Sequence, residues 1–166
     1  MKLVLYLTLV VLVASSCDST EVTQKNNVKL IENYISAVEN KDYDTMASLL
    51  ADSYVGIGPS VSDTTTRNLA LAAWKSNSAE LYESIKYSKS RVFPITVKDG
   101  DYPGEWVSNF ALLTVNYKNG KSVQLLANTS YKIKDGKITN SFTFYNEADA
   151  LEQLDYVFID LNDLNN

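Results

Sequence analysis

The stretch EWVSNFALLTVNYKNGKSVQLLANTSYKI, residues 105–133, decides the fold of this chain. Two long runs rich in β-branched and aromatic residues, 105–118 and 121–133, flank Asn119-Gly120. Asn-Gly is the strongest short hairpin signal, since both residues accept the positive φ angles of a two-residue turn. Asp135-Gly136 predicts a second tight turn into a strand over residues 137–145. The stretch therefore predicts an antiparallel meander of long strands.

Upstream of the meander the pattern changes from strand to helix. Residues 87–97 are strand-like, and a loop rich in Gly, Asp and Pro separates them from the meander. Apolar residues at helical spacing predict an amphipathic helix over about residues 25–39. A short helix capped by Asp42, a short strand over 53–57 and a third helix capped within Asp63–Thr66 are expected to follow. Helices before a meander indicate an α+β layered domain rather than a β-sandwich.

The first residues of the chain predict secretion and a lipid anchor. Lys2, an apolar run and small residues precede the only cysteine, Cys17, as in a lipoprotein signal. The apolar run is shorter than the roughly 20 residues of a membrane-spanning helix. We therefore expect acylation of Cys17 and a lipid-anchored protein of the cell envelope, on the periplasmic or outer-membrane face. A plain secretory signal with a free thiol is the alternative. The expected organisation is a signal over 1–16, a tether over 17–26, one domain over 27–158 and a tail over 159–166.

The composition excludes several kinds of chemistry. The chain has no histidine and one cysteine, so it contains no Ser-His or Cys-His nucleophile pair, no intramolecular disulfide and no thiolate metal cluster. We predict no metal and no cofactor. Removing the signal takes away one of the 15 basic residues and leaves 14 against 20 acidic ones, a net charge of −6. This acidic balance without a basic patch argues against nucleic acid as a partner.

The order of the expected elements resembles the nuclear transport factor 2-like superfamily, which includes SnoaL-like polyketide cyclases and ketosteroid isomerases. Residues 42–52 look like its second helix and the exit into strand one, residues 134–138 like its last hairpin, and Tyr145-Asn146-Glu147 like the strand end that closes the cone. The resemblance covers about residues 25–156. It implies the cone-shaped, cystatin-like α+β fold, in which three N-terminal helices lie against a curved, mostly antiparallel sheet around one conical cavity.

The resemblance also implies where a ligand would lie. Ketosteroid isomerases use an Asp base together with a Tyr and a protonated Asp that hold the enolate oxygen. Laid on this chain, the Tyr falls on Tyr34 and the second oxygen-holding position on Asn128. The base position falls on Gly58, which cannot accept a proton, and a rim aromatic falls on Tyr145. The resemblance therefore implies a pocket with two hydrogen-bond donors and no base.

Simpler interpretations exist for several of these residues. Tyr34 can be a core aromatic whose O–H binds backbone, and Asn128 can be a strand residue satisfied by its neighbours. Asp63 is the nearest carboxylate after Gly58, and we expect it to cap the third helix. Trp74 and Trp106 are expected in the core or in the cavity wall.

These observations predict a domain that binds a small apolar or carbonyl-bearing molecule in a conical pocket without catalysis. Two alternatives remain open: an isomerase, cyclase or dehydratase that uses a carboxylate elsewhere in the chain, and an interaction module of the envelope whose cavity is filled by side chains.

A homodimer through the outer face of the sheet is also expected. With Tyr145 and Asn128 inside the cone, Leu125, Phe142 and Phe144 would point outward, because neighbouring strand residues alternate between the two faces. An apolar outer face needs a cover. The second copy would supply that cover, or the C-terminal segment 148–159 would supply it instead.

Overall fold

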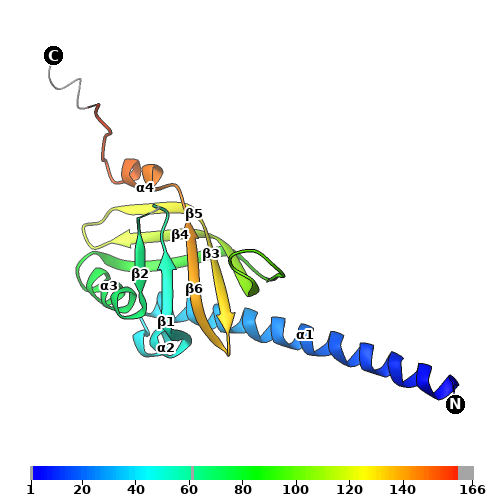
Figure 1. Cartoon of the computed structure of the whole chain (residues 1–166). Helices are drawn as coiled ribbons and strands as arrows, with labels where there is room; N and C mark the ends of the chain where they lie inside the picture. Colours follow the sequence, from blue (N-terminus) through cyan, green and yellow to red (C-terminus); the bar gives the residue numbers. More distant parts are fainter. Residues whose placement is uncertain (1, 61, 161–166) are drawn as a thin grey trace.

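The computed structural model describes residues 2–60 and 62–160, with side chains from Thr20 onward. Helices and strands follow one another along the described chain in the order that Figure 1 shows: α1 (Lys2–Asn40), α2 (Tyr43–Leu49), β1 (Leu50–Ile57), β2 (Thr64–Thr66), α3 (Arg67–Glu80), β3 (Tyr82–Val97), β4 (Gly104–Tyr117), β5 (Ser122–Lys134), β6 (Lys137–Phe144) and α4 (Glu147–Gln153).

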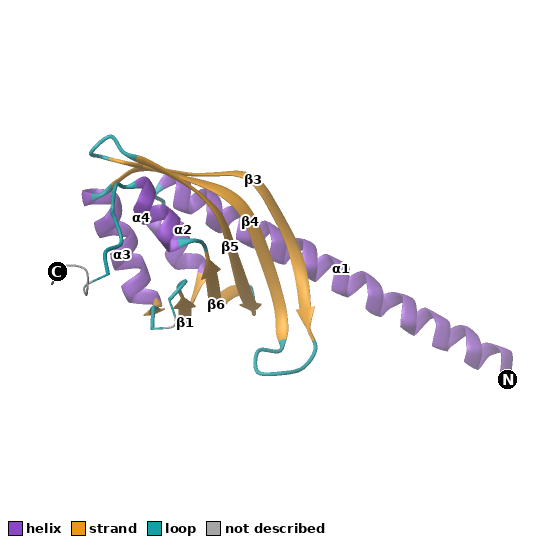
Figure 2. Cartoon of the chain, turned by 90° about the horizontal axis from the view of Figure 1, so that it is seen from above, coloured by secondary structure: helices purple, strands orange, loops and turns teal. Residues whose placement is uncertain are grey.

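The strands form one sheet in the order β2-β1-β6-β5-β4-β3. All neighbours pair antiparallel except β1 and β6, which pair in parallel. The meander β3–β6 has the expected order of connections. The β4–β5 turn is longer than the predicted two residues: Gly120 has a φ of 86° but Asn119 has no positive φ, and the Tyr117 N–H donates to the Lys121 carbonyl at 2.8 Å. The sheet curls around α1, α2 and α3 (Figure 2). The predicted α+β cone with helices against a curved, mostly antiparallel sheet is confirmed.

The first helix is longer than predicted. It begins at Lys2, so the expected start near residue 25 is wrong. Residues 2–40 contain neither Gly nor Pro, so nothing in this stretch breaks the backbone pattern once the helix has formed. The helix ends at Asn40, and Lys41 follows with a φ of 57°, the left-handed conformation that terminates helices. Within the described residues, no helix combines the length and the apolar character needed to cross a membrane.

Two further expectations about local structure need correction. Asp63 does not cap α3: it lies in the turn between β1 and β2, and Thr66 holds the N-cap position without a side-chain hydrogen bond. Residues 64–66 pair with β1 as the short strand β2, because backbone pairing satisfies their polar groups instead. The strand expected from residue 87 starts at Tyr82. By contrast, the predicted cap at Asp42 is confirmed, since its side chain accepts the Thr45 N–H at 3.0 Å.

The main core lies between α1 and the face of the sheet that it covers, called the inner face below. Ile31, Tyr34, Ile35 and Val38 recur along one side of α1 and are all buried, as the helical spacing predicts. They pack with residues of β4, β5 and β6, among them Val107, Tyr131, Ile133 and Ile138. Full burial of such a side chain contributes roughly 1.5–3 kcal/mol, so α1 is a main stabilising element of the domain.

Candidate functional site

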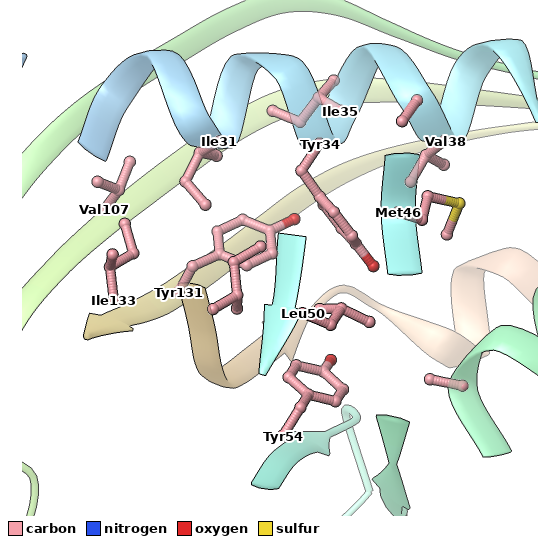
Figure 3. Packing of buried hydrophobic residues seen from close by; sticks show 13 residues of the cluster. Ile31, Tyr34, Ile35, Val38, Met46, Leu50, Tyr54, Val107, Tyr131 and Ile133 are labelled. Atoms are coloured by element: carbon pink, nitrogen blue, oxygen red, sulfur yellow. The ribbon is translucent and has the colours of Figure 1, made fainter. Parts of the chain in front are cut away.

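Three buried tyrosines and the half-buried Tyr87 gather on the inner face. Tyr34 comes from α1, Tyr54 from β1, Tyr87 from β3 and Tyr131 from β5. Figure 3 shows that Tyr34, Tyr54 and Tyr131 reach into one interior from three elements. The rings of Tyr34 and Tyr131 meet edge to face with centroids 5.9 Å apart. The Tyr54 hydroxyl lies 2.7 Å from the Ser141 hydroxyl oxygen. The cluster thus places several hydroxyls inside the cone.

Burial keeps these hydroxyls neutral. It is the largest cause that raises the pKa of Tyr34 far above its usual value, and the neighbouring Tyr54 and Tyr87 add to it. Burial, followed by the charge of Glu39, raises the pKa of Tyr87 to about 12. The pKa of Tyr131 is likewise well above its usual value, first through burial. Neutral phenols donate and accept hydrogen bonds, so the cluster can hold a neutral oxygen but supplies no base at physiological pH.

Trp74 lies beside Tyr34, in the wall of this interior. It is half-buried on α3 and packs against the core cluster. Its hydrogen bond to the Tyr34 side chain partly opposes the rise in the pKa of that tyrosine. The indole nitrogen is a donor only, so the Tyr34 oxygen accepts this bond. The structure therefore brings Tyr34 and Trp74 together, as two of the predicted pocket residues.

The predicted pairing of Tyr34 with Asn128 is wrong. Asn128 lies directly between Phe110 and Phe144 in the sheet, and both phenylalanines are exposed on the face opposite α1, called the outer face below. The Asn128 amide donates to Ser108 Oγ at 2.8 Å and to the Asn109 carbonyl at 3.3 Å. Tyr131, three residues further along β5, is in the core with Tyr34. The period of two in a strand thus places Asn128 outside the cone.

The same alternation corrects the prediction for Leu125 and Trp106. Leu125 is buried and faces inward, whereas its neighbour Leu126 is 82% exposed on the outer face. Trp106 lies opposite Lys132 and Ile95, on the outer face, where Tyr102 and Phe142 pack around it. Its indole N–H donates to the Tyr102 carbonyl at 3.0 Å. Trp106 therefore forms an outer aromatic cluster and not a wall of the cone, while Phe142 and Phe144 face outward as expected.

Tyr145 follows β6 at the end of the sheet where Tyr82 and Tyr117 form an edge-to-face pair. It is half-buried, and its pKa is raised first by burial and then by the charges of Glu147 and Asp63. Tyr145 lies too close to two carboxylates to serve as an anionic group itself.

Asp63 occupies the space beside Gly58. A Cβ at Gly58 would lie 1.9 Å from Asp63 Oδ2, and the Gly58 N–H donates to the Asp63 carbonyl at 2.8 Å. The carboxylate of Asp63 therefore stands where a side chain at position 58 would begin. Sequence reasoning missed this approach because four residues lie between the two positions.

Sequence reasoning also missed a polar group in the middle of the inner face. Asn109, Thr129 and Thr143 lie side by side on β4, β5 and β6, and they are called the inner polar strip below. Thr129 and Thr143 share a hydrogen bond of 3.2 Å between their hydroxyls. Asn109 is only 2% exposed, and its Oδ1 has no hydrogen-bond partner. The sequence pattern could not have revealed the strip, because a two-residue turn at Asn119-Gly120 would place Asn109 opposite Ser130, whereas the observed register places it opposite Thr129.

The inner face is less covered at this strip than at either end. Along β5, Val123 and Leu125 are buried, Ala127 and Thr129 are half-buried, and the inner residues from Tyr131 on are buried again. Leu113 on β4 and Thr143 on β6 are also half-buried. Side chains on the concave side of a curled sheet remain accessible only where nothing fills the space above them. Thr129 and Thr143 are therefore partly accessible between two closed ends, whereas Asn109 beside them is buried.

A second hollow, of about 480 Å³, lies outside the cone between α2, the start of β1 and the β5–β6 turn. Two of its cations bind backbone carbonyls: Arg67 donates from Nη2 to the Ala47 carbonyl at 2.8 Å, although its Nε has no hydrogen-bond partner, and Lys137 binds the Ser48 carbonyl. These carbonyls belong to the last turn of α2, where cations stabilise a helix end. The hollow thus supports α2 and is not the candidate site.

Comparison with known proteins agrees with this architecture. No family profile matches the sequence, and no curated protein matches it significantly. Solved structures do match. A proposed polyketide cyclase from Xanthomonas campestris has a TM-score of 0.66 at 16% identity, over 79% of this chain and 98% of that one. An LEH-like epoxide hydrolase from Mycobacterium tuberculosis has a TM-score of 0.63 at 15% identity, over 80% of this chain and 91% of that one.

An NTF2-like protein from Burkholderia xenovorans has a TM-score of 0.61 at 17% identity, over 78% of this chain and 96% of that one. Identities this low establish the fold alone. The chain therefore has the nuclear transport factor 2-like fold, as the sequence resemblance implied, and its function has to be argued from the site.

Proposed function

We propose that this chain binds a small neutral molecule, apolar apart from a carbonyl or hydroxyl oxygen, against the inner polar strip and without catalysis. The observation that carries the proposal is the partial exposure of Thr129 and Thr143 on the inner face, between two buried ends. A concave surface with a few polar groups among apolar side chains is the usual form of a small-molecule site.

The chemistry of the surrounding groups favours a neutral ligand. The tyrosine hydroxyls are held neutral by burial, and each hydrogen bond they form with a ligand contributes only about 0.5–1.5 kcal/mol net. Trp74 supplies apolar area beside Tyr34. The nearby carboxylate of Glu39 is already engaged, because its Oε1 accepts the Tyr87 N–H at 2.7 Å. These groups orient an oxygen and contribute no proton acceptor.

Titration with a neutral aryl ketone, acetophenone, tests the proposal. We expect chemical-shift changes at the Trp74 indole in NMR spectra, and about fivefold weaker binding in Tyr34→Phe, the loss expected for one hydrogen bond. Tyr156→Phe is the matched control, because Tyr156 is 62% exposed and outside the cone. If neither acetophenone nor the alcohol and ether probes used below bind to the wild type, the proposed function is wrong.

A second candidate function is catalysis with Asp63 as the proton acceptor. The observation that favours it is the position of Asp63 Oδ2, which lies where a side chain at Gly58 would begin. Asp63 is exposed, so solvent competes for its carboxylate. Turnover of a β,γ-unsaturated ketone by the wild type, abolished in Asp63→Asn, would establish this function in place of simple binding.

The cellular setting and the assembly are proposals as well. Acylation at Cys17 would hold the domain at the envelope membrane, where the small molecule would be met outside the cytoplasm. A second copy would cover the outer face, on which Phe93 and Phe110 stack with centroids 6.0 Å apart and remain 40% and 51% exposed. Leu126 and Phe144 extend this apolar surface across β5 and β6. The same surface would serve the alternative function of an envelope interaction module.

A further inference from the structure

Asn109 is the most unusual polar residue of the interior. Its side chain points to the same face as Val107, two residues earlier on β4, and Val107 is in the core. Only 2% of Asn109 is exposed, and Oδ1 finds no partner. Most buried polar atoms in proteins are hydrogen-bonded, and an unpaired one destabilises the folded state, so its presence calls for an explanation such as a function.

The neighbours of Asn109 explain why its amide oxygen Oδ1 is unpaired. On one side, β3 places Val92 opposite it, and Val92 has no polar side-chain atom. On the other side, β5 places Thr129 opposite Asn109. The Thr129 hydroxyl already forms hydrogen bonds with the side chains of Thr143 and Tyr131. The Asn128 amide binds the backbone carbonyl of Asn109 and not its side chain. The sheet therefore holds an amide oxygen at the inner polar strip and leaves it unsatisfied.

We infer that Asn109 determines the ligand class of the inner site, and that the ligand carries an O–H or N–H group that donates to Asn109 Oδ1. This inference rests on the proposed function, which by itself requires only a ligand oxygen. A carbonyl oxygen can accept from the tyrosine hydroxyls but gives nothing to an amide oxygen. An alcohol, a phenol or a lactam satisfies both. A simple ketone or ether leaves Asn109 unpaired in the complex, as it is in the free protein.

Stability measurements test the inference without any ligand. Asn109→Leu keeps the branched shape and removes the unpaired amide, so we expect Tm to rise by roughly 2–4 °C. Asn109→Val, which is smaller and suited to a strand, should also raise Tm if Leu is too large for the space. Asn116→Leu on the same strand is the matched control. Its amide donates to Ser84 Oγ and accepts from Ser122 Oγ, both at 2.9 Å, so Tm should fall.

Binding measurements use phenol and anisole. The oxygen attached to the benzene ring carries a proton in phenol and a methyl group in anisole. We expect the wild type to bind phenol at least fivefold more tightly than anisole, and Asn109→Leu to bind both equally. Equal binding of the two probes by the wild type, or tighter binding of anisole, would overturn the inference and leave the proposed function standing. If neither probe nor acetophenone binds, the proposed function fails, and binding of acetophenone alone would overturn the inference and leave the proposed function standing. A fall in Tm in both Asn109 variants, as in Asn116→Leu, would overturn the inference whatever the probes do.

Discussion

Replacement of Gly58 by Ala tests how the loop after β1 is built. A Cβ at this position would lie 1.9 Å from Asp63 Oδ2, 2.6 Å from its Cγ and 3.1 Å from its Cβ. Non-bonded heavy atoms prefer separations of about 3.5–4.0 Å. The Asp63 side chain therefore has to leave its place in Gly58→Ala.

We expect this variant to lose about 1–2 kcal/mol of unfolding free energy, the lower part of the range for an overpacked site. We expect the lower part of the range because Asp63 is exposed and its carboxylate can rotate into solvent. Urea denaturation followed by tryptophan fluorescence measures the change. Asp63→Ala removes Oδ2 and Cγ and leaves only the 3.1 Å contact, so the double variant should recover at least half of the loss.

A Gly58→Ala protein as stable as the wild type would refute this contact, and so would a loss that Asp63→Ala does not reduce. The geometry also bears on any attempt to add a base at position 58. Gly58→Asp alone would bring two carboxylates into one space, where they repel each other and cannot both ionise freely. A fair test of an added base combines Gly58→Asp with Asp63→Ala.

Four further predictions concern anchoring, assembly and pH. Cys17→Ala should move the protein from the membrane fraction to the soluble fraction, and retention in the membrane would contradict acylation. Sedimentation at micromolar concentration should show a dimer for the wild type and a monomer for Leu126→Glu, whereas a monomeric wild type would exclude the dimer. Folding raises the pKa of the inner-face tyrosines, to about 12 for Tyr87. The stability that they contribute is therefore complete below the pKa of an unfolded tyrosine, near 10, and is lost as pH rises toward the folded values. Tyrosinate absorbance should increase together with unfolding. The Thr45 backbone and hydroxyl lower the pKa of Asp42, so its contribution should be lost as pH falls through that lowered pKa, and Asp42→Ala should remove this acid dependence.

The predicted fold succeeded where local patterns were sufficient. The Asn119-Gly120 turn, the helical spacing of α1 and the cap at Asp42 each depend on residues close in sequence. Turn conformation and helix capping are governed by a few adjacent backbone angles, so sequence alone is informative about them. The sequence alone also excludes catalysis by histidine, because a residue type that the chain lacks cannot act at any position of the fold.

The candidate site was predicted only in part. Tyr34 and Trp74 both lie at the core, as expected for core or cavity-wall residues, but the pairing of Tyr34 with Asn128 that the resemblance implied is absent, since Asn128, like Trp106, belongs to the outer face. The reason is that β5 carries apolar residues on both faces, with Leu125 buried and Leu126 exposed. When both faces of a strand are apolar, a period of two cannot tell which set points inward.

By itself, then, the sequence determined the order of α1, α2, β1, α3 and the four strands of the meander, though not β2 or α4, together with the α+β class and the lack of histidine chemistry. Only the tertiary structure decided which face of the sheet α1 covers, and hence which residues enter the cone. It also decided that Asn109 is unpaired, since that depends on Val92 and Thr129 from neighbouring strands. Burial and hydrogen-bond satisfaction are properties of neighbours brought together from distant parts of the chain, and no local pattern encodes them.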